Sequence, residues 1–329
     1  MWVVAKDHHP QLVRDLTGGL APNLADLGAF AGSDRLRTDG RPGPELRAKL
    51  RRIDNARNAW TVLWVLMAPV GIVWATIRVG HWAAVGVAFV AMGTMFPRLY
   101  ILTHEAAHRL LFSSKRANDV IGEKVLGLIA FGDGGSTYRL GHAQHHRDEF
   151  GPNEPDFGLY ARYPISGASL RRKLARDALG VSGWKNLKPI LRGLVRSGYR
   201  RRALKALAAQ GLIFSLFVLA GHPWLYVLIW FLPWMTYWRV VNRLRALAEH
   251  AGMTRHDDRR YTTHHIHQHW IASVLFVPFN TGYHLAHHVD SGIPWRNLPD
   301  FHTALEQDGY LDGVPTHTSY VGFWRTLTK

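Results

Sequence analysis

Three long apolar runs set the strongest limit on how this 329-residue chain folds. Residues 59–77 are 19 positions without a charged side chain, and residues 82–103 are apolar except for Arg98. A third run, residues 206–238, holds 33 uncharged positions. A helix needs about 20 consecutive apolar residues to cross the hydrocarbon core of a bilayer. The first two runs therefore each predict a membrane-spanning helix.

The third run is too long for one crossing and contains Gly221-His222-Pro223, which favours a tight turn between two antiparallel helices. We therefore predict two hairpins of spans, near residues 59–79, 82–103, 204–220 and 223–242. A buried core helix is the alternative for any single run, but tryptophans near several of the ends favour the membrane. The predicted fold class is an all-α membrane protein with four transmembrane helices and a mostly helical cytoplasmic cap.

The formal net charge of +16 is spread over three polar segments. Segment 1–58 carries 10 Lys and Arg residues, segment 104–202 carries 18 and segment 243–329 carries 8. Because cytoplasmic segments of membrane proteins are enriched in Lys and Arg, we predict that all three, and both termini, face the cytoplasm. The same charge favours anionic lipid headgroups, so the expected partners are membrane lipids and not nucleic acid.

Histidine is abundant, with 20 residues, whereas cysteine is absent. The absence of cysteine excludes a Cys-ligated zinc site and an iron–sulfur cluster held by this sequence. Histidines at positions i, i+3 and i+4 share one face of a helix, so they can direct their imidazoles at one metal ion. Three clusters with this spacing lie in the predicted cytoplasmic segments: His104 with His108; His142 with His145 and His146; and His284 with His287 and His288.

Eight imidazoles exceed the four ligands of one zinc ion and suit two metal ions. Imidazole binds zinc, copper, iron and nickel, so the ligand type alone does not select the metal. His250, just after the fourth predicted span, is a ninth candidate ligand. The alternative for each cluster is a polar helix face at the membrane surface. Repetition of the spacing on one predicted side of the membrane favours a metal centre.

The order HxxxH, HxxHH and HxxHH, with paired spans before the first cluster and between the second and third, resembles the integral-membrane fatty acid desaturase family. Flanking sequences are also similar to the family: NEPD at residues 153–156, NTGY at residues 280–283 and PWRNLP at residues 294–299. The resemblance covers residues 59–300 as the membrane domain. Residues 1–58 are then a cytoplasmic N-terminal segment, and residues 301–329 a cytoplasmic C-terminal tail.

The resemblance implies an O2-dependent oxidoreductase that introduces a C=C bond into a fatty acyl chain. It implies two non-haem iron ions as cofactor, O2 as co-substrate, and a ferredoxin or cytochrome b5 with its reductase as external electron donor. The implied iron ligands, named here the nine-histidine set, are His104, His108, His142, His145, His146, His250, His284, His287 and His288.

Two features differ from the animal acyl-CoA desaturases. The first cluster has three intervening residues where those enzymes have four, and Ala246 stands where they have an asparagine. Both differences argue against an animal acyl-CoA desaturase, and neither identifies the substrate. A hydroxylase or ketolase acting on a sphingolipid or carotenoid is the alternative with the same centre. A membrane metal transporter is a distant alternative, because the predicted spans are nearly free of the ionisable residues that transport requires.

Acidic and polar residues near the clusters are candidates for orienting the metal ligands through their second ring nitrogen. We name Glu105, Asp156, Glu249 and Asn280 for this role, with Asp148 and Asp290 as further acids. We expect Glu149 to be a solvated surface acid instead. Tyr283 and Trp295 are candidates to line a tunnel for the acyl chain, or equally to anchor the chain at the membrane interface or pack in a core.

The run His264-His265-Ile266-His267-Gln268-His269 also has metal-binding character, because alternate residues share one face of a strand. It lies outside the three clusters and follows the charged residues 257–260. We therefore predict an exposed or supporting segment rather than part of the metal centre.

Overall fold

A computed structural model describes residues 10–23, 25–132, 134 and 136–329 of the chain. This part is mostly helical, with one short two-stranded parallel sheet. It divides into two compact units. Among the described residues, unit 1 comprises residues 54–139 and 171–242, and unit 2 comprises residues 10–53, 140–170 and 243–329. Each unit is described separately below.

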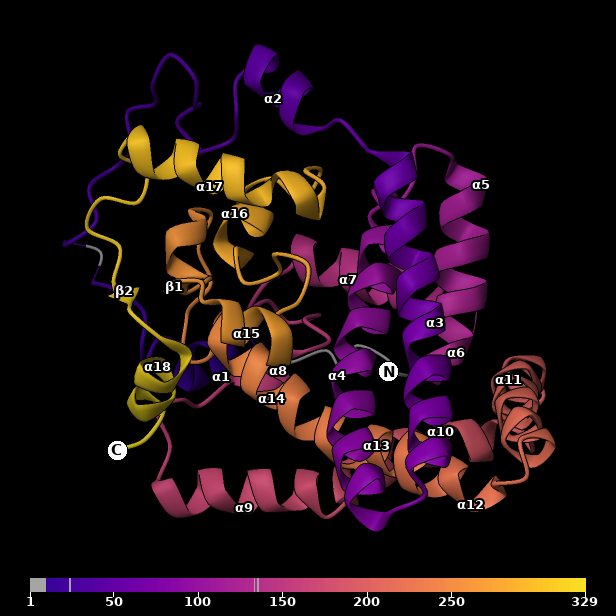
Figure 1. Cartoon of the computed structure of the whole chain (residues 1–329). Helices are drawn as coiled ribbons and strands as arrows, with labels where there is room; N and C mark the ends of the chain where they lie inside the picture. Colours follow the sequence, from indigo (N-terminus) through magenta and orange to yellow (C-terminus); the bar gives the residue numbers. More distant parts are fainter. Residues whose placement is uncertain (1–9, 24, 133, 135) are drawn as a thin grey trace. The chain divides into compact units, whose positions relative to one another are not determined.

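Unit 1 is built around long helices (Figure 1). Its elements are α3 (Asn55–Val79), α4 (Trp82–Ala107), α5 (Lys115–Ala117), the π-helical η1 (Asn118–Leu126), α6 (Gly127–Ile129), α10 (Val181–Gly193), α11 (Arg200–Leu219), α12 (Pro223–Leu225), the π-helical η2 (Tyr226–Phe231) and α13 (Leu232–Met235). The chain passes between the units within three further helices, α7 (Thr137–Arg147), α9 (Gly167–Ala178) and α14 (Tyr237–His250).

Unit 2 consists of short elements joined by ordered loops. They are α1 (Pro10–Leu16), α2 (Pro44–Leu50), α8 (Phe157–Tyr160), the 3₁₀ turn η3 (Arg259–Tyr261), β1 (His265–Ile266), α15 (Trp270–Leu275), α16 (His284–Val289), the 3₁₀ turn η4 (Trp295–Asn297), α17 (Leu298–Gln307), β2 (Thr316–His317) and α18 (Tyr320–Thr326). Strands β1 and β2 pair in parallel, with His265 opposite Thr316.

The first predicted hairpin of spans is present as α3 and α4, which run side by side (Figure 1). The side chain of Asp54 accepts a hydrogen bond from Arg57 N and so begins α3. Gly80 ends α3 in the left-handed conformation, with φ of 63°, which a residue without a Cβ adopts without strain. His81 then accepts from Ala83 N and begins α4. The link between the two helices is therefore as short as the sequence predicts.

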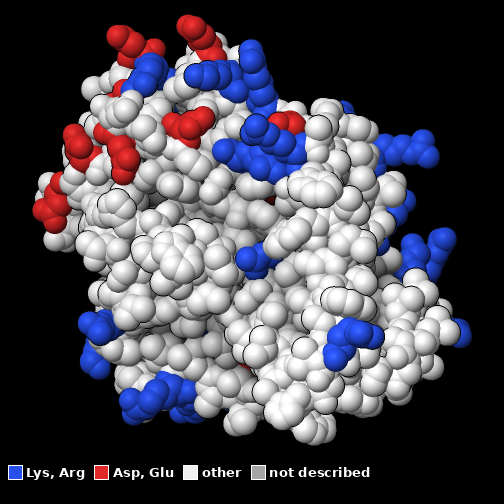
Figure 2. Space-filling model, in the orientation of Figure 1, with Lys and Arg blue, Asp and Glu red and all other residues white. Residues whose placement is uncertain are grey.

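Three helices in the described part of the chain are long and apolar enough to cross a membrane: α3, α4 and α11. Their outward faces carry large apolar side chains, among them Trp60, Trp74 and Leu219, which are 69%, 65% and 83% exposed. Figure 2 shows a broad surface poor in charged residues over the region that α3 and α4 occupy in Figure 1. A surface of this kind is stable against lipid tails rather than water.

The region predicted as a fourth span, residues 223–242, is not one regular helix. Residues 223–235 form a run through α12, η2 and α13, and the backbone leaves the helical conformation at Thr236. The carbonyl of Trp234 accepts a hydrogen bond from Arg239 Nε, and Pro233 has no N–H to continue a helical ladder. The run before the break is about 20 Å long at 1.5 Å per residue, which is shorter than a bilayer core. A fourth crossing stays a prediction.

Within unit 1, η1 crosses α4 at a point where only glycine fits. A Cβ at Gly122 would lie 1.9 Å from the Cβ of Ala106, far closer than two carbon atoms can approach. Ala106 lies between His104 and His108 in the last turn of α4 and its cap. The close crossing therefore fixes the end of α4 that carries the first histidine cluster.

Gly122→Ala is expected to lower the free energy of unfolding by about 1–3 kcal/mol, because the added methyl group forces α4 and η1 apart. Thermal unfolding of the purified protein in detergent measures the change. The matched control is Gly211→Ala on α11, where a Cβ meets no atom within 4 Å. That substitution is expected to raise the free energy of unfolding by about 0.5–1 kcal/mol. Equal effects of the two substitutions would contradict the crossing.

Unit 2 has an apolar core that holds α16 in place. Leu285, Ala286 and Val289 on one side of α16 pack with residues of α17 such as Phe301 and Leu305, all buried. Because these apolar positions alternate with the histidines around the helix, α16 presents His284, His287 and His288 on its other side. The HxxHH pattern is thus the polar half of an amphipathic turn.

Candidate metal centre

The second and third histidine clusters meet within unit 2. His146 on α7 places its Nε2 atom 3.1 Å from Nε2 of His142 and 3.2 Å from Nε2 of His287 on α16. The ligand nitrogens of these three residues lie within 4.8 Å of one another. We call His142, His146 and His287 the three-histidine group. Residues about 140 positions apart in the sequence therefore direct their imidazoles at one point.

A second group lies beside it and contains one carboxylate. Its members are His145, Glu149, His250 and His288, whose ligand atoms also lie within 4.8 Å of one another and which are all buried. We call it the mixed group. The rings of His146 and His288 stack at 4.4 Å and so connect the two groups. His284 joins the mixed group through its Nε2 atom, 3.0 Å from Nε2 of His250.

The hydrogen bonds of His250 leave a nitrogen lone pair available for a metal ion. Its Nδ1 atom lies 2.8 Å from the carbonyl oxygen of Thr262, and only a protonated nitrogen can donate to a carbonyl. The Nε2 atom is then unprotonated and faces the Nε2 atom of His284. Burial lowers the pKa of His250 to about 3, which keeps the ring neutral. A neutral imidazole held in this way is the form that binds a transition metal.

His288 gives a second indication that the donor set fits a metal. Its ring is 3% exposed, and its Nε2 atom has no hydrogen-bond partner among the described residues. A buried nitrogen without a partner is costly in a folded protein unless a ligand satisfies it. The buried, neutral, converging imidazoles therefore fit the coordination chemistry of iron, zinc or a similar ion.

Glu149 is not the solvated surface acid that the sequence predicted. It is 4% exposed, and its Oε1 atom lies 2.7 Å from Nδ1 of His288 and 3.5 Å from Nδ1 of His250. Arg259 pairs with its other oxygen. The prediction was wrong because it treated an acid after the end of a helix as solvated. The spacing of four residues from His145 was the available signal, since it places Glu149 near the same side of the chain.

The carboxylate nearest to His145 is Glu154, which the sequence analysis did not name for this role. Glu154 is completely buried, with its oxygens 3.0 and 3.1 Å from Nδ1 of His145. Burial alone lowers the pKa of His145, but the attraction of Glu154 outweighs it and raises the pKa to about 9. Asp156, the predicted residue, lies within 4.8 Å of the same ring and donates from its backbone N–H to Glu154. Both acids of the NEPD sequence, Glu154 and Asp156, therefore lie beside His145.

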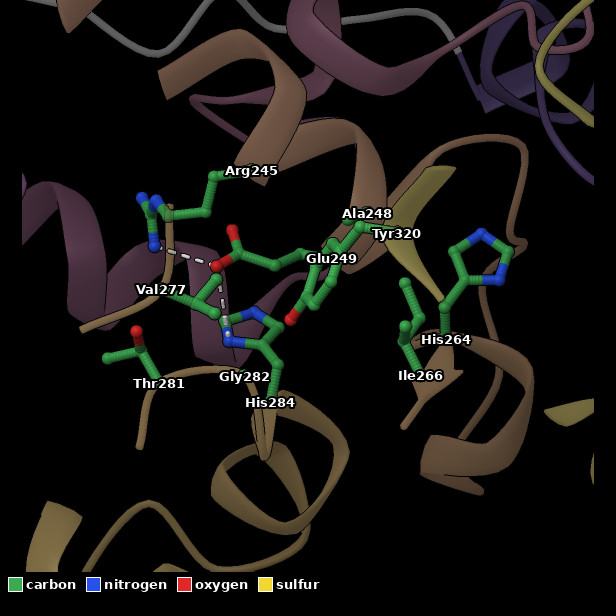
Figure 3. Close-up of a pocket in the computed structure, with 10 residues that line it drawn as sticks. All are labelled: Arg245, Ala248, Glu249, His264, Ile266, Val277, Thr281, Gly282, His284 and Tyr320. Carbon is green, nitrogen blue, oxygen red and sulfur yellow. Dashed lines mark hydrogen bonds and ion pairs between the residues drawn. The ribbon is translucent and has the colours of Figure 1, made fainter. Parts of the chain in front are cut away.

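Glu249 contacts one member of the nine-histidine set, His284. Its Oε1 atom lies 3.5 Å from Nδ1 of His284 and 2.7 Å from Nη1 of Arg245. Figure 3 marks both contacts with dashed lines. Burial raises the pKa of Glu249 to about 7. These three residues line a cavity of about 10 Å³, which has room for roughly one water molecule and not for an acyl chain.

The first histidine cluster belongs to unit 1. The rings of His104 and His108 lie 4.7 Å apart at the end of α4, and Glu105 Oε1 lies 3.3 Å from Nδ1 of His104. Glu105 is 1% exposed and so contacts the ring in a buried environment. Arg139 donates to the carbonyl oxygens of Ala106 and Ala107 and closes the end of the helix. The pair is therefore positioned by its own helix cap.

The other predicted residues have different contacts. The Asn280 amide donates to the carbonyl oxygen of Trp295, and the ring of Tyr283 lies 5.0 Å from that of His302. Trp295 is 6% exposed within the core of unit 2, in agreement with core packing, the alternative to a tunnel lining. The two further acids pair with arginines: Asp148 with Arg255, and Asp290 with Arg47.

The run from His264 to His269, predicted to be exposed or supporting, is buried in its first half, so the exposed alternative is wrong there. His264 and His265 are each 7% exposed, and His264 Nε2 lies 2.7 Å from the carbonyl oxygen of Ala251. His267 and His269 are exposed. The charged residues before the run do not make it exposed, because Arg260 is itself buried and forms an ion pair with Asp258.

Comparisons with known proteins agree with this geometry. The family model described as Fatty acid desaturase matches residues 80–320. An sn-1 oleoyl-lipid 12-desaturase of Arthrospira platensis is 20% identical over 265 residues, 75% of each chain. Another, from Anabaena variabilis, is 21% identical over 284 residues, 77% of this chain and 78% of the relative. A zeaxanthin 4-ketolase of Chlamydomonas reinhardtii is 31% identical over 139 residues, 38% of this chain and 29% of the relative.

The family match covers well over half of the sequence and includes all three histidine clusters. The relatives matched over three quarters of the chain are lipid desaturases by name. The chain therefore belongs to the fatty acid desaturase family, and it is an oxidoreductase that acts as a lipid desaturase.

Proposed function

We propose that the protein introduces a C=C bond into an acyl chain carried by a membrane lipid, with O2 as oxidant, at a centre of two iron ions held by the nine-histidine set. The observation that carries this proposal is the convergence of seven of these histidines, from α7, α14 and α16, into two adjacent groups in unit 2. Burial lowers the pKa of His250, His284 and His288, so these rings are neutral and suit a transition metal rather than Mg²⁺ or Ca²⁺.

His104 and His108 are the remaining members of the set. Their spacing of four residues places both rings on one side of α4, and Glu105 contacts Nδ1 of His104. We propose them as further iron ligands, as the family resemblance implies. The close crossing at Gly122 fixes the end of α4 that carries both histidines, as a metal ligand requires.

Removal of hydrogen from an unactivated C–H bond requires activated O2, and bound iron ions would supply that activation. The chain's own residues prepare the ligands. Glu149, Glu154 and Glu249 each lie within 3.5 Å of the Nδ1 atom of a histidine, and so fix which ring nitrogen carries the proton. The same carboxylates offset the positive charge of the metal ions, which neutral imidazoles leave uncompensated.

The substrate proposal rests on the relatives and on the surface of unit 1. Two relatives are named for oleoyl groups on lipids. Exposed apolar faces on α3, α4 and α11 are suited to contact with lipid, from which such a substrate diffuses. We further propose that the histidines and both termini face the cytoplasm, and that a ferredoxin, or cytochrome b5 with its reductase, supplies the electrons. The printed sequence has no cysteine for a cluster of its own.

A ketolase or hydroxylase is the second candidate function. The zeaxanthin 4-ketolase relative favours it, because its identity of 31% is higher than that of the desaturase relatives, although over a shorter stretch. The same iron centre would supply the chemistry for inserting oxygen into a C–H bond in place of removing a second hydrogen. Substrate position relative to the metal ions separates the two outcomes.

Lipid analysis of cells that express the protein tests the proposal. Mass spectrometry is expected to find acyl lipids that have lost two hydrogen atoms, in wild type and not in a His146→Ala variant. Products that have gained oxygen on a ring lipid would favour the ketolase. No new lipid, from protein shown to hold iron and supplied with a reductant, would contradict both.

A further inference from the structure

A third group of metal-binding side chains lies in unit 2, apart from the nine-histidine set. His265 of β1 and His302 of α17 place their Nε2 atoms 3.2 Å apart. Glu306 Oε1 lies 3.4 Å from Nε2 of His302. The ligand atoms of the three residues all lie within 4.8 Å of one another. We call this the His265 group; it shares no residue with the three-histidine group or the mixed group.

The sequence explains how these residues come together. His302 and Glu306 are four residues apart on α17 and therefore share one face, while Phe301 and Leu305 on the other side pack in the core. His265 is fixed by the pairing of β1 with β2, which places it opposite Thr316. Two rigid elements of unit 2 therefore present the three donors to one point.

Hydrogen bonds fix the tautomer of His265. The hydroxyl of Thr316 donates its single proton to the carbonyl oxygen of Val314, at 3.1 Å. The same hydroxyl oxygen lies 3.1 Å from Nδ1 of His265 and therefore accepts the proton of that nitrogen. Nε2 of His265 is then unprotonated, with its lone pair directed at His302. This is the arrangement of a histidine ligand held by a neighbouring oxygen.

The two histidines of the His265 group are buried, whereas its carboxylate is open to solvent, so an ion could enter the group from solvent. His265 and His302 are 7% and 8% exposed. The Glu306 side chain is 46% exposed and opens the group to solvent. Two imidazoles and one carboxylate are a common donor set for zinc, with water as the fourth ligand.

We propose that the His265 group binds one divalent cation of the zinc class, and that this ion joins β1 to α17 independently of the di-iron centre. The expected consequence is stability rather than catalysis, because the ion cross-links segments about 40 residues apart in the native state only. The proposal does not depend on the substrate or on the reaction outcome.

Zinc binding by the purified full-length, iron-loaded protein tests the proposal. The wild type is expected to bind one further zinc ion per chain, and its thermal unfolding temperature is expected to rise when zinc is added. His302→Gln is expected to weaken zinc binding at least about ten-fold, with iron content unchanged. The matched control, His269→Gln, changes an exposed histidine close to His265 and is expected to bind zinc as the wild type does.

Retention of iron reports whether each variant folds. If His302→Gln loses its iron, Glu306→Gln replaces it, because the exposed Glu306 side chain tolerates the change without disturbing the core. Cobalt offers a second readout, since tetrahedral Co²⁺ absorbs visible light strongly. Equal zinc affinity in the wild type and in a folded variant would overturn the proposal, as would wild-type protein that binds no zinc beyond the iron sites.

Discussion

His250→Ala is expected to abolish desaturation and to lower the iron content of the purified protein. His250 is 2% exposed, its Nδ1 proton is held by Thr262, and its Nε2 atom faces His284 at 3.0 Å. Removal of the ring takes one ligand from the mixed group, and loss of a buried ligand costs far more than a surface change. Elemental analysis and product formation with a supplied reductant measure the two effects.

The control for His250 is the double variant His267→Gln, His269→Gln. Both side chains are exposed, so this variant is expected to keep its iron and most of its activity. Substitution of the whole run from His264 to His269 is not a suitable control, because His264 and His265 are buried. If the double variant lost its iron while His250→Ala kept it, the assignment of His250 would be wrong.

Glu149→Gln is expected to reduce iron affinity or activity by about 10–100-fold, the usual range for a carboxylate that orients a metal-bound histidine. The substitution keeps the shape of the side chain but removes the charge beside Nδ1 of His288. It also leaves Arg259 without its buried ionic partner. Iron titration of the metal-free protein, with activity measured in parallel, gives the size of the effect.

Asp257→Asn is the matched control for Glu149, because Asp257 is an exposed acid two residues from Arg259. It is expected to leave iron affinity and activity close to those of the wild type. Similar losses in both variants would mean that the general charge near Arg259, rather than contact with His288, explains the result.

The sequence predicted the parts of the fold that depend on local pattern. Apolar length identified α3 and α4, and the spacing of histidines on α7 and α16 predicted which rings share a helix face. These features depend on residues close together in the chain. The fourth span was less predictable, because the break at Thr236 lies where the carbonyl of Trp234 accepts a hydrogen bond from the side chain of Arg239.

Contacts between distant segments could not be predicted in the same way. Glu149 is an ordinary acid in the sequence, and its position beside His288 depends on how the end of α7 packs with α16. Glu154 reaches His145 through the fold of the loop that follows α7. His265 and His302 are separated by more than 30 residues, and their contact depends on how β1 and α17 lie in the folded unit 2. Histidine spacing predicts a metal centre, whereas the structure shows which carboxylates contact its candidate ligands.

Iron content per chain tests the central claim most directly. Elemental analysis of purified wild-type protein is expected to find about two iron ions per chain, because the nine-histidine set exceeds the ligands of one ion. His146→Ala and His287→Ala are expected to lower that content, since both residues belong to the three-histidine group. Protein that holds zinc and no iron, and that still converts its lipid substrate, would contradict the account.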